Sequence, residues 1–461
     1  MGARPELTAA LQAAVGRERV LTDAADCYAY GYDNSRRHAL PDAVVFADQE
    51  TEIQQIVAAC RHTRTPLVVR GRGTGTTGAA VPIRGGVVLS LERMNRILAV
   101  DSANRLMRTE PGASNQDVQM AAQGHGFFWA PDPTSAAYCS VGGNIAVNAA
   151  GPRAVKYGTV RENVLGLRAV TGAGTLIQTG VNTTKGAVGY DLTRLLIGSE
   201  GTLAIITQAT LKLTPRAAAR RTLRAVYQDM HGAAQAVARI MGQAVTPCAL
   251  EFLDGDAIRM AKGFQGTSLA AAGALLLIEV DGPEAAMPES LDAITQAARG
   301  AGLLDLAVAK TEEEAKALWA TRKALSPALR SIAPNKLNED VVVPVSHIPA
   351  LIAGLRELSE RFAIPIVNFG HAGNGNIHVN LLYDSQDAEQ ERHARPCLSE
   401  VFDLVLRLGG TLSGEHGIGM EKRDYIGRAI DPPTLALMRA IKAQFDPDGI
   451  LNPAKLFPIV E

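Results

Sequence analysis

RGRGTGTTGAAVP, residues 70–82, is a run of small residues that directly follows a predicted strand at 66–71. Three of its glycines match the spacing GxGxxG of dinucleotide-binding proteins, but that motif requires a helix after the third glycine. Pro82 and a glycine pair soon after it exclude a long helix here. The run is therefore predicted to be a helix-free loop whose backbone N–H groups converge on an anion such as a phosphate. A glycine-rich surface turn is the alternative.

Two further runs have the same character. PDPTSAAYCSVGGNIAVNAAG at 131–151 contains a predicted bend at Gly142-Gly143-Asn144, and IGSEGTLAIITQATLKLTP at 197–215 places a tight turn before a strand. Between residues 43 and 81 the pattern is a strand, a helix predicted at 50–63 and a second strand, and short β-rich segments follow up to residue 215. These patterns predict an α+β first domain over 1–215, with its core at about 40–215.

From residue 216 onward, strands alternate with amphipathic helices. Strands are predicted at 222–229, 249–255, 273–282 and 303–310, and helices at 232–245, 289–302 and 312–330. Two strand–helix–strand halves in series predict an open sheet with its helices on one face. A third stretch, 365–461, contains two Gly/His clusters and ends in a helix and a turn.

The composition excludes several classes of protein. The 461 residues include 46 basic and 47 acidic side chains, a formal net charge of −1. The sequence therefore has no excess of basic residues of the kind that binds nucleic acid. The longest apolar stretch, 270–278, has half the length that a membrane-spanning helix needs. The N-terminal residues do not resemble a secretory signal. We therefore expect no transmembrane segment and a cytoplasmic location. The five cysteines, an odd number without a Cys-x-x-Cys, are expected to be reduced thiols.

Histidines gather in two glycine-rich segments near the C-terminus. NFGHAGNGNIHVNLL contains His371 and His378, and SGEHGIGMEKRDYI contains Glu415 and His416. Residues 376–382 are predicted to form a strand that projects His378 to the same face as its second neighbours, Asn376 and Asn380. Two histidines and one carboxylate can hold a divalent metal and leave coordination positions open, as a catalytic metal requires. We assign Glu415 to the metal and His416 to proton transfer. Satisfied polar residues near a domain interface are the alternative.

The three glycine-containing runs together resemble the FAD-binding domain of the vanillyl-alcohol oxidase/p-cresol methylhydroxylase flavoprotein family. This resemblance covers roughly 40–215 and continues through the C-terminal part. It implies a two-part FAD-binding domain at 1–215, a cap domain at 216–415 with an antiparallel sheet covered by helices on one face, and a segment at 416–461 that returns to the FAD domain.

The resemblance also implies residues for the cofactor. Arg72, Gly73, Thr74, Gly75, Thr76 and Gly78 would hold the FAD pyrophosphate; Pro131, Asp132, Ser135, Gly142, Gly143 and Asn144 would flank the flavin; Glu200, Gly201 and Ile206 would lie along the adenosine side. Some relatives attach the flavin to a histidine of the pyrophosphate loop. This loop has threonines and no histidine, so we expect non-covalent FAD.

The histidine motifs resemble those of the FAD-dependent (R)-2-hydroxy-acid dehydrogenases, which include D-lactate dehydrogenase, D-2-hydroxyglutarate dehydrogenase and the flavoprotein subunit of glycolate oxidase. The resemblance implies a divalent metal on His371, His378 and Glu415, with zinc expected and manganese or iron as alternatives, and His416 as the base. For the substrate it implies Arg322 and Ser326 on one helix face, Lys336 in the following loop, and Asn380.

The activity expected from this resemblance is oxidation of a (R)-2-hydroxy acid, D-lactate or a similar short acid, with reduction of FAD. D-2-hydroxyglutarate is the alternative substrate; a glycolate oxidase subunit, a flavin-dependent ether-lipid synthase and a non-enzymatic electron-relay subunit are more distant ones. Electrons are expected to leave to a separate acceptor, an electron-transfer flavoprotein, a quinone or a cytochrome, with oxygen left open. Peripheral association with the inner membrane and a homodimer are compatible with the sequence.

Overall fold

The computed structural model describes residues 4–260, 272–329 and 332–458, without the side chains of residues 326 and 327. The chain forms two compact units. The first unit comprises Met1–Ala150, Gly158–Arg216 and Glu415–Glu461, and the second comprises Gly151–Tyr157 and Ala217–Gly414. The chain thus enters the second unit twice. No pattern in the sequence indicates the early excursion at 151–157.

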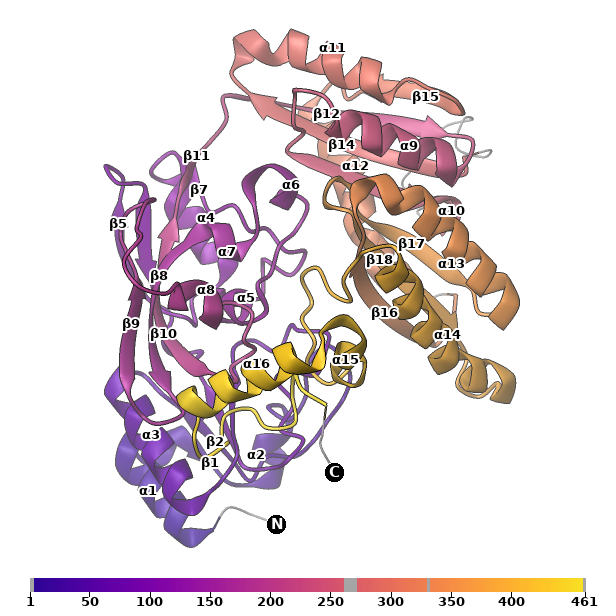
Figure 1. Ribbon diagram of the computed structural model, residues 1–461. Coiled ribbons are helices and arrows are strands. Elements are labelled where there is room, and N and C mark those ends of the chain that lie inside the picture. Colours follow the sequence, from indigo (N-terminus) through magenta and orange to yellow (C-terminus); the bar gives the residue numbers. More distant parts are fainter. Residues whose placement is uncertain (1–3, 261–271, 330–331, 459–461) are drawn as a thin grey trace. The chain divides into compact units, whose positions relative to one another are not determined.

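The N-terminal part of the first unit is built on a four-stranded sheet in the order β1-β2-β4-β3 (Figure 1). Strands β2, β4 and β3 run parallel, and the connection from β2 to β3 contains helix α3. β2 and β4 are buried along their whole length, as expected for apolar strands of a parallel sheet. The elements are α1 (Pro5–Val15), η1 (Arg17–Arg19), β1 (Val20–Leu21), α2 (Ala24–Tyr28), β2 (Ala43–Phe46), α3 (Glu50–Thr63), β3 (Leu67–Arg70) and β4 (Val87–Ser90).

The second part of the first unit is an antiparallel sheet in the order β5-β6-β10-β8-β9, accompanied by the short pair β7–β11. Trp129 is fully buried in its hydrophobic core. The elements are β5 (Ile97–Asp101), β6 (Leu106–Thr109), α4 (Asn115–Gln123), β7 (Phe127–Phe128), α5 (Val141–Val147), α7 (Val160–Asn163), β8 (Val164–Thr171), β9 (Leu176–Gly180), α8 (Leu192–Leu196), β10 (Ala204–Lys212) and β11 (Thr214–Pro215).

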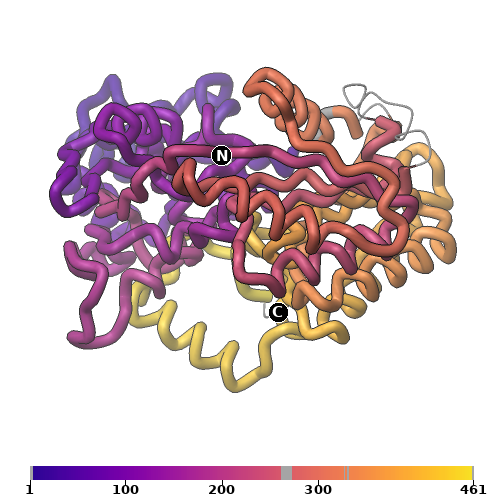
Figure 2. The backbone as a smooth tube through the Cα atoms, turned by 90° about the horizontal axis from the view of Figure 1, so that it is seen from above, coloured from indigo at the N-terminus to yellow at the C-terminus, as the bar shows by residue number. Residues whose placement is uncertain are grey.

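The C-terminal segment completes the first unit. It contains η7 (Arg423–Tyr425), α15 (Ile426–Ala429) and α16 (Pro432–Phe445), drawn in yellow in Figures 1 and 2. Ile441 and Phe445 of α16 pack on the core of the antiparallel sheet, and Leu451 is buried in the core around the four-stranded sheet. The backbone N–H of Leu67 in β3 donates to the carbonyl of Ile450.

The second unit is a seven-stranded antiparallel sheet in the order β15-β12-β14-β13-β17-β18-β16. Its strands are β12 (Ala219–Tyr227), β13 (Ala249–Asp254), β14 (Ala274–Gly282), β15 (Leu303–Val308), β16 (Asn335–Val342), β17 (Ile366–His371) and β18 (Asn376–Tyr383). Helices α9 (Met230–Met241), α11 (Met287–Ala298), α13 (Ile348–Phe362) and α14 (Ala388–Arg407) cover one face of this sheet, which confirms the expected α+β architecture.

The opposite face of the sheet carries α10 (Gly255–Met260) and α12 (Glu312–Ala328). Leu325 of α12 packs there with Leu253 and Phe369, which lie opposite each other on β13 and β17. The short elements α6 (Ala154–Tyr157), η3 (Glu284–Ala286), η5 (Val345–His347) and η6 (Ala372–Asn374) complete the unit. No helix in the described part of the chain has the length and apolar character that a bilayer crossing needs.

Two local predictions differ from the structure. Lys336 was expected in a loop, but it lies in β16, which pairs with β18 along its whole length. This strand is rich in polar residues and lies at the edge of the sheet, so its composition does not signal a strand. The expected bend at Gly142-Gly143-Asn144 is the short helix α5, because the hydroxyl of Ser140 caps its first turn by accepting from the N–H of Gly143.

Candidate functional site

The glycine loop at 71–82 leaves β3 and contains no helix, as predicted. Gly73 and Gly78 have positive φ angles of 66° and 76°, a conformation that favours glycine. The hydroxyl of Thr76 is buried and makes no hydrogen bond. A Cβ on Gly75 would meet only the Asp33 carboxylate, at 4.0 Å, so open space lies beside this backbone. An unsatisfied buried hydroxyl beside open space fits a loop that holds a polar ligand.

Two buried, oppositely charged side chains, Arg70 and Asp33, lie next to this loop. Arg70 donates to the carbonyls of Tyr32 and Ala29, and Asp33 accepts from the N–H groups of Ser35 and Ala80. Burial raises the pKa of Asp33 and lowers that of Arg70, while the attraction between the two groups opposes both shifts. These residues connect the segment at 29–35 to the loop, and neither was predicted from the sequence as part of the site.

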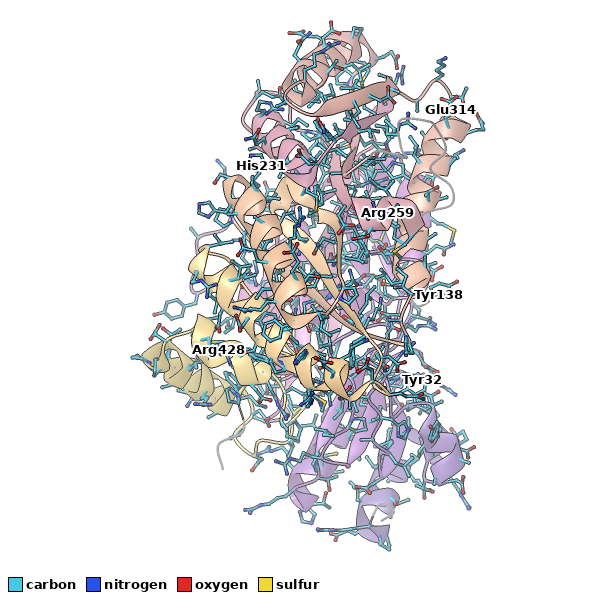
Figure 3. The ribbon with its side chains drawn as sticks, turned by 90° about the vertical axis from the view of Figure 1, so that its right-hand side faces the viewer. Tyr32, Tyr138, His231, Arg259, Glu314 and Arg428 are labelled. Atoms are coloured by element: carbon cyan, nitrogen blue, oxygen red, sulfur yellow. The ribbon has the colours of Figure 1, made fainter. Side chains whose placement is uncertain are left out.

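The segment at 131–144 also belongs to the first unit, where the side chain of Asn115 binds both of its ends. Asn144 is buried, and its side-chain oxygen accepts from the amide of Asn115. A Cβ on Gly142 would lie 2.6 Å from Pro111 Cβ, which explains the small residue at this position. Pro131 is buried, Asp132 and Ser135 are partly buried, and the neighbouring Tyr138 is 75% exposed (Figure 3).

Glu200 connects the third glycine run to the C-terminal segment. Its buried carboxylate accepts from the N–H groups of Ile418 at 2.6 Å and Gly419 at 2.8 Å. Burial raises the pKa of Glu200, although these N–H donors act against the shift. The neighbouring Gly201 has a φ of 69°, and Ile206 lies buried in β10.

The candidate base lies in the same segment. The carbonyl of His416 accepts from the hydroxyl of Thr77, and the N–H of Met420 donates to the carbonyl of Thr77. Asn452 donates to the carbonyls of Ala79 and Glu200. The backbone of residues 416–420 is therefore fixed along the glycine loop within the first unit.

The two candidate metal-binding histidines lie on one face of the second unit's sheet. His371 ends β17 and His378 lies in β18; both are buried, and their rings meet edge to face with centroids 5.1 Å apart. The predicted strand at 376–382 is present, and Ile377, Val379 and Leu381 are fully buried in the core as expected. His371, His378 and Glu415 each offer one ligand atom, and these atoms lie within 4.8 Å of one another.

Glu415 directly follows Gly414, whose backbone the second unit fixes. The N–H of Gly414 donates to the carboxylate of Asp340 in β16 at 2.9 Å, and the hydroxyl of Ser413 donates to the same carboxylate. Asp340 is fully buried and pairs with His378 across the two strands. Asp340 thus anchors the turn that leads into the candidate metal-binding carboxylate.

A buried carboxylate stands beside His371. Glu251 of β13 is fully buried, and its Oε1 lies 2.5 Å from Nδ1 of His371. Its Oε2 accepts from Nε of Arg322 at 2.7 Å, with Nη2 also at 2.7 Å. Burial alone would raise the pKa of Glu251, but the hydrogen bond from His371 and the charge of Arg322 hold it below its usual range. Glu251 was not predicted from the sequence, although an acid inside the apolar run ALEFLD was a usable signal.

The residues predicted for the substrate lie in the second unit. Arg322 is buried at 7% exposure, and its guanidinium lies 4.8 Å from the ring centroid of Phe369. Asn380 is fully buried, and its amide donates to the carbonyls of Val367 and His378 while its side-chain oxygen has no partner. Lys336 is partly buried in β16. Ser326 belongs to α12, but its side chain lies outside the described residues.

Two family models match the chain. Residues 41–180 match the FAD binding domain, and residues 216–456 match the C-terminal domain of FAD linked oxidases. The chain belongs to the FAD-linked oxidase family.

The curated relatives of this FAD-linked oxidase are similar over almost their whole length. A glycolate oxidase subunit of Bacillus subtilis is 37% identical over 93% of the chain and 92% of the relative. A D-lactate dehydrogenase of Anaerostipes hadrus is 33% identical over 91% and 90%, and a D-2-hydroxyglutarate dehydrogenase of Stutzerimonas stutzeri is 33% identical over 98% and 99%.

The fold of this FAD-linked oxidase is also found among solved structures. A p-cresol methylhydroxylase structure superimposes with a TM-score of 0.80 at 16% identity, over 99% of this chain and 97% of that one. This likeness confirms the two-part fold that the resemblance predicted. The chain thus carries an FAD-binding domain, and the unsatisfied Thr76 hydroxyl and the open backbone at Gly75 in its glycine loop fit a bound FAD pyrophosphate.

Proposed function

We propose that this FAD-linked oxidase is a dehydrogenase that oxidises a (R)-2-hydroxy acid, D-lactate or a similarly short acid, to the 2-oxo acid. The observation that carries the proposal is the group formed by His371, His378 and Glu415 in a chain with an FAD-binding domain. Two neutral nitrogens and one carboxylate oxygen are a donor set that holds divalent zinc, manganese or iron. Relatives named for three 2-hydroxy-acid activities support the substrate class.

The two groups that the residues would hold supply different parts of the chemistry. A divalent metal on His371, His378 and Glu415 would lower the pKa of the substrate hydroxyl. FAD, held without a covalent bond because its loop has no histidine, would accept the hydride from C2. This donor set suits zinc, manganese and iron, and zinc is the metal that we propose.

The remaining steps belong to the chain's own side chains. His416 accepts the hydroxyl proton, since histidine is the side chain that exchanges protons near neutral pH. Its backbone is fixed by Thr77 in the glycine loop, which limits how far the imidazole can move. Arg322 supplies a fixed positive charge for the substrate carboxylate. Asn380 and Ser326 complete the proposed polar lining.

The length of the substrate depends on Lys336. A second substrate carboxylate, as in D-2-hydroxyglutarate, would need this cation. Two buried acids, Glu339 and Asp340, lie in the same strand, and their negative charge opposes a second carboxylate nearby. We therefore favour a short monocarboxylate, with D-2-hydroxyglutarate as the alternative.

The experiment that tests this function is anaerobic stopped-flow reduction of the bound flavin. D-lactate, L-lactate, glycolate and D-2-hydroxyglutarate are each mixed with enzyme before and after removal of metal by a chelator. We expect bleaching by a short D-acid that chelation abolishes and added zinc restores. A flavin spectrum that all four acids leave unchanged would overturn the 2-hydroxy-acid assignment. Bleaching that survives chelation would overturn the proposed role of the metal.

We further propose that the reduced enzyme passes its electrons to a separate acceptor, an electron-transfer flavoprotein, a quinone or a cytochrome. Reoxidation of the reduced flavin by a soluble quinone, by a cytochrome, by an electron-transfer flavoprotein and by dissolved oxygen can be compared in the same instrument. Faster reoxidation by oxygen than by any of the three acceptor types would contradict this part of the proposal.

A further inference from the structure

A carboxylate behind a metal-binding histidine can decide which ring nitrogen meets the metal. The register between β13 and β17 pairs Leu253 with Phe369, and its continuation brings Glu251 opposite His371. The contact of 2.5 Å joins Glu251 Oε1 to Nδ1 of His371. An ionised carboxylate only accepts hydrogen bonds, so His371 must carry its proton on Nδ1. The lone pair of Nε2 is then available to a metal.

The other oxygen of the same carboxylate fixes Arg322. Nε and Nη2 of the guanidinium both lie 2.7 Å from Oε2, and the guanidinium also stacks on Phe369. Glu251 therefore connects the histidine proposed for the metal to the arginine proposed for the substrate. The contacts to Glu251 use Nε and Nη2 of the guanidinium.

We propose that Glu251 is a positioning residue that selects the Nδ1–H tautomer of His371 for metal binding and holds Arg322 in a fixed relation to that metal. The inference rests on the proposed function, because it assumes that His371 is a metal ligand. It assigns to Glu251 no contact with substrate or cofactor. Carboxylates that accept from metal-bound histidines raise metal affinity and orient the ring.

The neighbouring strand provides a matched control. Glu279 of β14 is also buried, at 5% exposure, and its carboxylate accepts from the indole N–H of Trp319 at 2.9 Å and is paired with Arg220. Trp319 and Arg220, the partners of Glu279, are not metal-ligand candidates. The change Glu279→Gln removes the same charge from the same sheet without altering the bond to His371.

The test measures metal affinity rather than turnover. Wild type, Glu251→Gln, Glu251→Asp and Glu279→Gln are purified with FAD bound, stripped of metal, and titrated with Zn²⁺ against a chromophoric chelator. We expect Glu251→Gln to lower Zn²⁺ affinity by about 10–100-fold with unchanged FAD content. Glu251→Asp, which keeps the charge but is too short to reach, should lower it as well. Glu279→Gln should keep the wild-type affinity. The visible spectrum of Co²⁺-loaded protein should change only in the Glu251 variants.

The outcomes separate this inference from the proposed function. Failure of the wild type to bind Zn²⁺ would overturn the metal site itself. Wild-type Zn²⁺ affinity in Glu251→Gln would overturn only the role of Glu251. Where the variants do not fold, the ¹⁵N spectrum of the histidine rings in the metal-free wild type decides, with His371→Asn for assignment. A protonated Nδ1 on His371 supports the proposal, and a protonated Nε2 overturns it.

Discussion

Gly142 is a position where one added methyl group would collide with Pro111. A Cβ there would lie 2.6 Å from Pro111 Cβ and 3.0 Å from its carbonyl oxygen, and neither can move without the chain. We expect Gly142→Ala to lower the free energy of unfolding by about 1–3 kcal/mol through overpacking, and to reduce FAD content. Denaturant unfolding and the flavin absorbance measure both effects.

A second helical glycine serves as the control for this change. Gly427 lies within α15, and a Cβ there meets nothing within 4 Å. Alanine loses less chain entropy than glycine when it enters a helix, so Gly427→Ala should raise stability by about 0.5–1 kcal/mol. Equal effects of the two substitutions would contradict the steric account of Gly142.

His416 is the residue on which the proposed proton transfer depends. We expect His416→Ala to keep its FAD and to slow flavin reduction by about 10²-fold or more, because no other group takes the hydroxyl proton. Rapid-mixing absorbance under anaerobic conditions gives this rate. His231, an exposed residue of α9 visible in Figure 3, provides the comparison, and its replacement by alanine should leave the rate unchanged. Unaltered reduction in His416→Ala would remove His416 from the mechanism.

Among single residues, the sequence could indicate those whose chemistry is unusual for their surroundings. His371 and His378 stand out because they flank glycine turns in a chain with nine histidines. Glu251 could not be placed, since its partner depends on the register between β13 and β17. Register is a property of pairing across the sheet, and a single strand's pattern does not contain it.

Helices and strands were predicted correctly where their apolar residues recur at a regular spacing. Segments that mix polar and apolar residues without such a spacing were missed. The helix expected at 50–63 is α3, with the same bounds, because its apolar residues recur along one face. Strand β16 was missed because its polar and apolar residues do not alternate and because it buries two acids, Glu339 and Asp340. A strand that carries functional groups loses the pattern by which strands are recognised.

Asp254 joins three elements of the second unit. It ends β13, and its carboxylate accepts from the N–H of Ala257 in α10 at 2.8 Å and from that of Asn368 in β17. Burial raises the pKa of Asp254 from 3.8 to about 7, against these N–H donors. Between these two pH values the folded protein binds more protons than the unfolded one. Its free energy of unfolding therefore decreases as the pH rises through this range.

The change Asp254→Asn removes this titration. We expect the wild type to exceed Asp254→Asn in stability by more at pH 5 than at pH 8, as measured by urea unfolding at both pH values. Asp292, an exposed residue of α11, is the control, since Asp292→Asn should show no such difference. A stability difference that does not depend on pH would show that Asp254 is ionised throughout.

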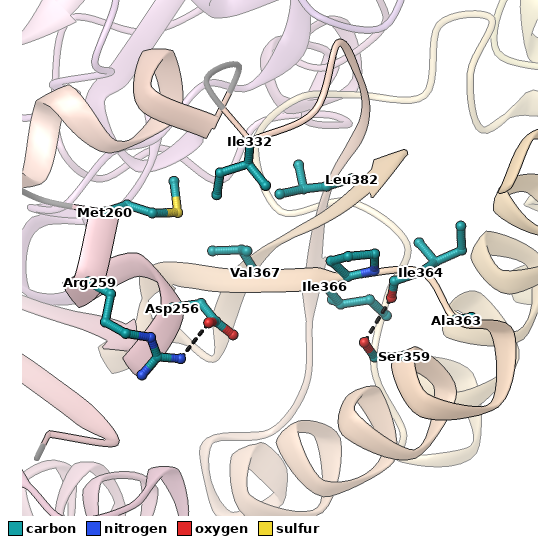
Figure 4. Close-up of a pocket in the computed structure, with 11 residues that line it drawn as sticks. Asp256, Arg259, Met260, Ile332, Ser359, Ala363, Ile364, Ile366, Val367 and Leu382 are labelled. Carbon is teal, nitrogen blue, oxygen red and sulfur yellow. Dashed lines mark hydrogen bonds and ion pairs between the residues drawn. The ribbon is translucent and has the colours of Figure 1, made fainter. Parts of the chain in front are cut away.

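The second unit contains the cavity drawn in Figure 4. It has a volume of about 410 Å³ and lies beside β17 and β18, with Val367 and Leu382 on its wall and the ion pair of Asp256 and Arg259 at its side. Val367 and Leu382 belong to the same hydrophobic cluster as Phe369, the ring on which Arg322 stacks.

The first unit is built from segments that precede and follow the second unit in sequence, and its stability depends on both. Leu451 is buried in the core around the four-stranded sheet, Asn452 donates to the carbonyls of Ala79 and Glu200, and the Lys455 ammonium donates to the carbonyl of Val81. Burial lowers the pKa of Lys455 to about 8. The glycine loop is thus supported by residues more than 350 positions away in sequence.

We expect deletion of residues 446–461 to abolish FAD binding and to unfold the first unit, because it removes these core and hydrogen-bonding groups together. Flavin content after gel filtration and calorimetric unfolding report the two effects. Asn452→Ala, which keeps the chain, should lower FAD content without abolishing it. Leu437→Ala, at a residue of α16 that is 63% exposed, should behave as wild type. Full FAD binding by the truncated chain would show that the segment is dispensable.

The first unit is divided between 1–216 and 415–461, and this division restricts the order in which the two units can fold during translation. The second unit can fold as soon as residue 414 has emerged, since its early piece at 151–157 is already outside. The strands of the first unit must wait, with β3 lacking the partner that Ile450 provides, until translation has passed residue 455. A nascent chain stalled before that point should expose the apolar surfaces of β2 and β4 and depend on chaperones, and only the released chain should take up its flavin.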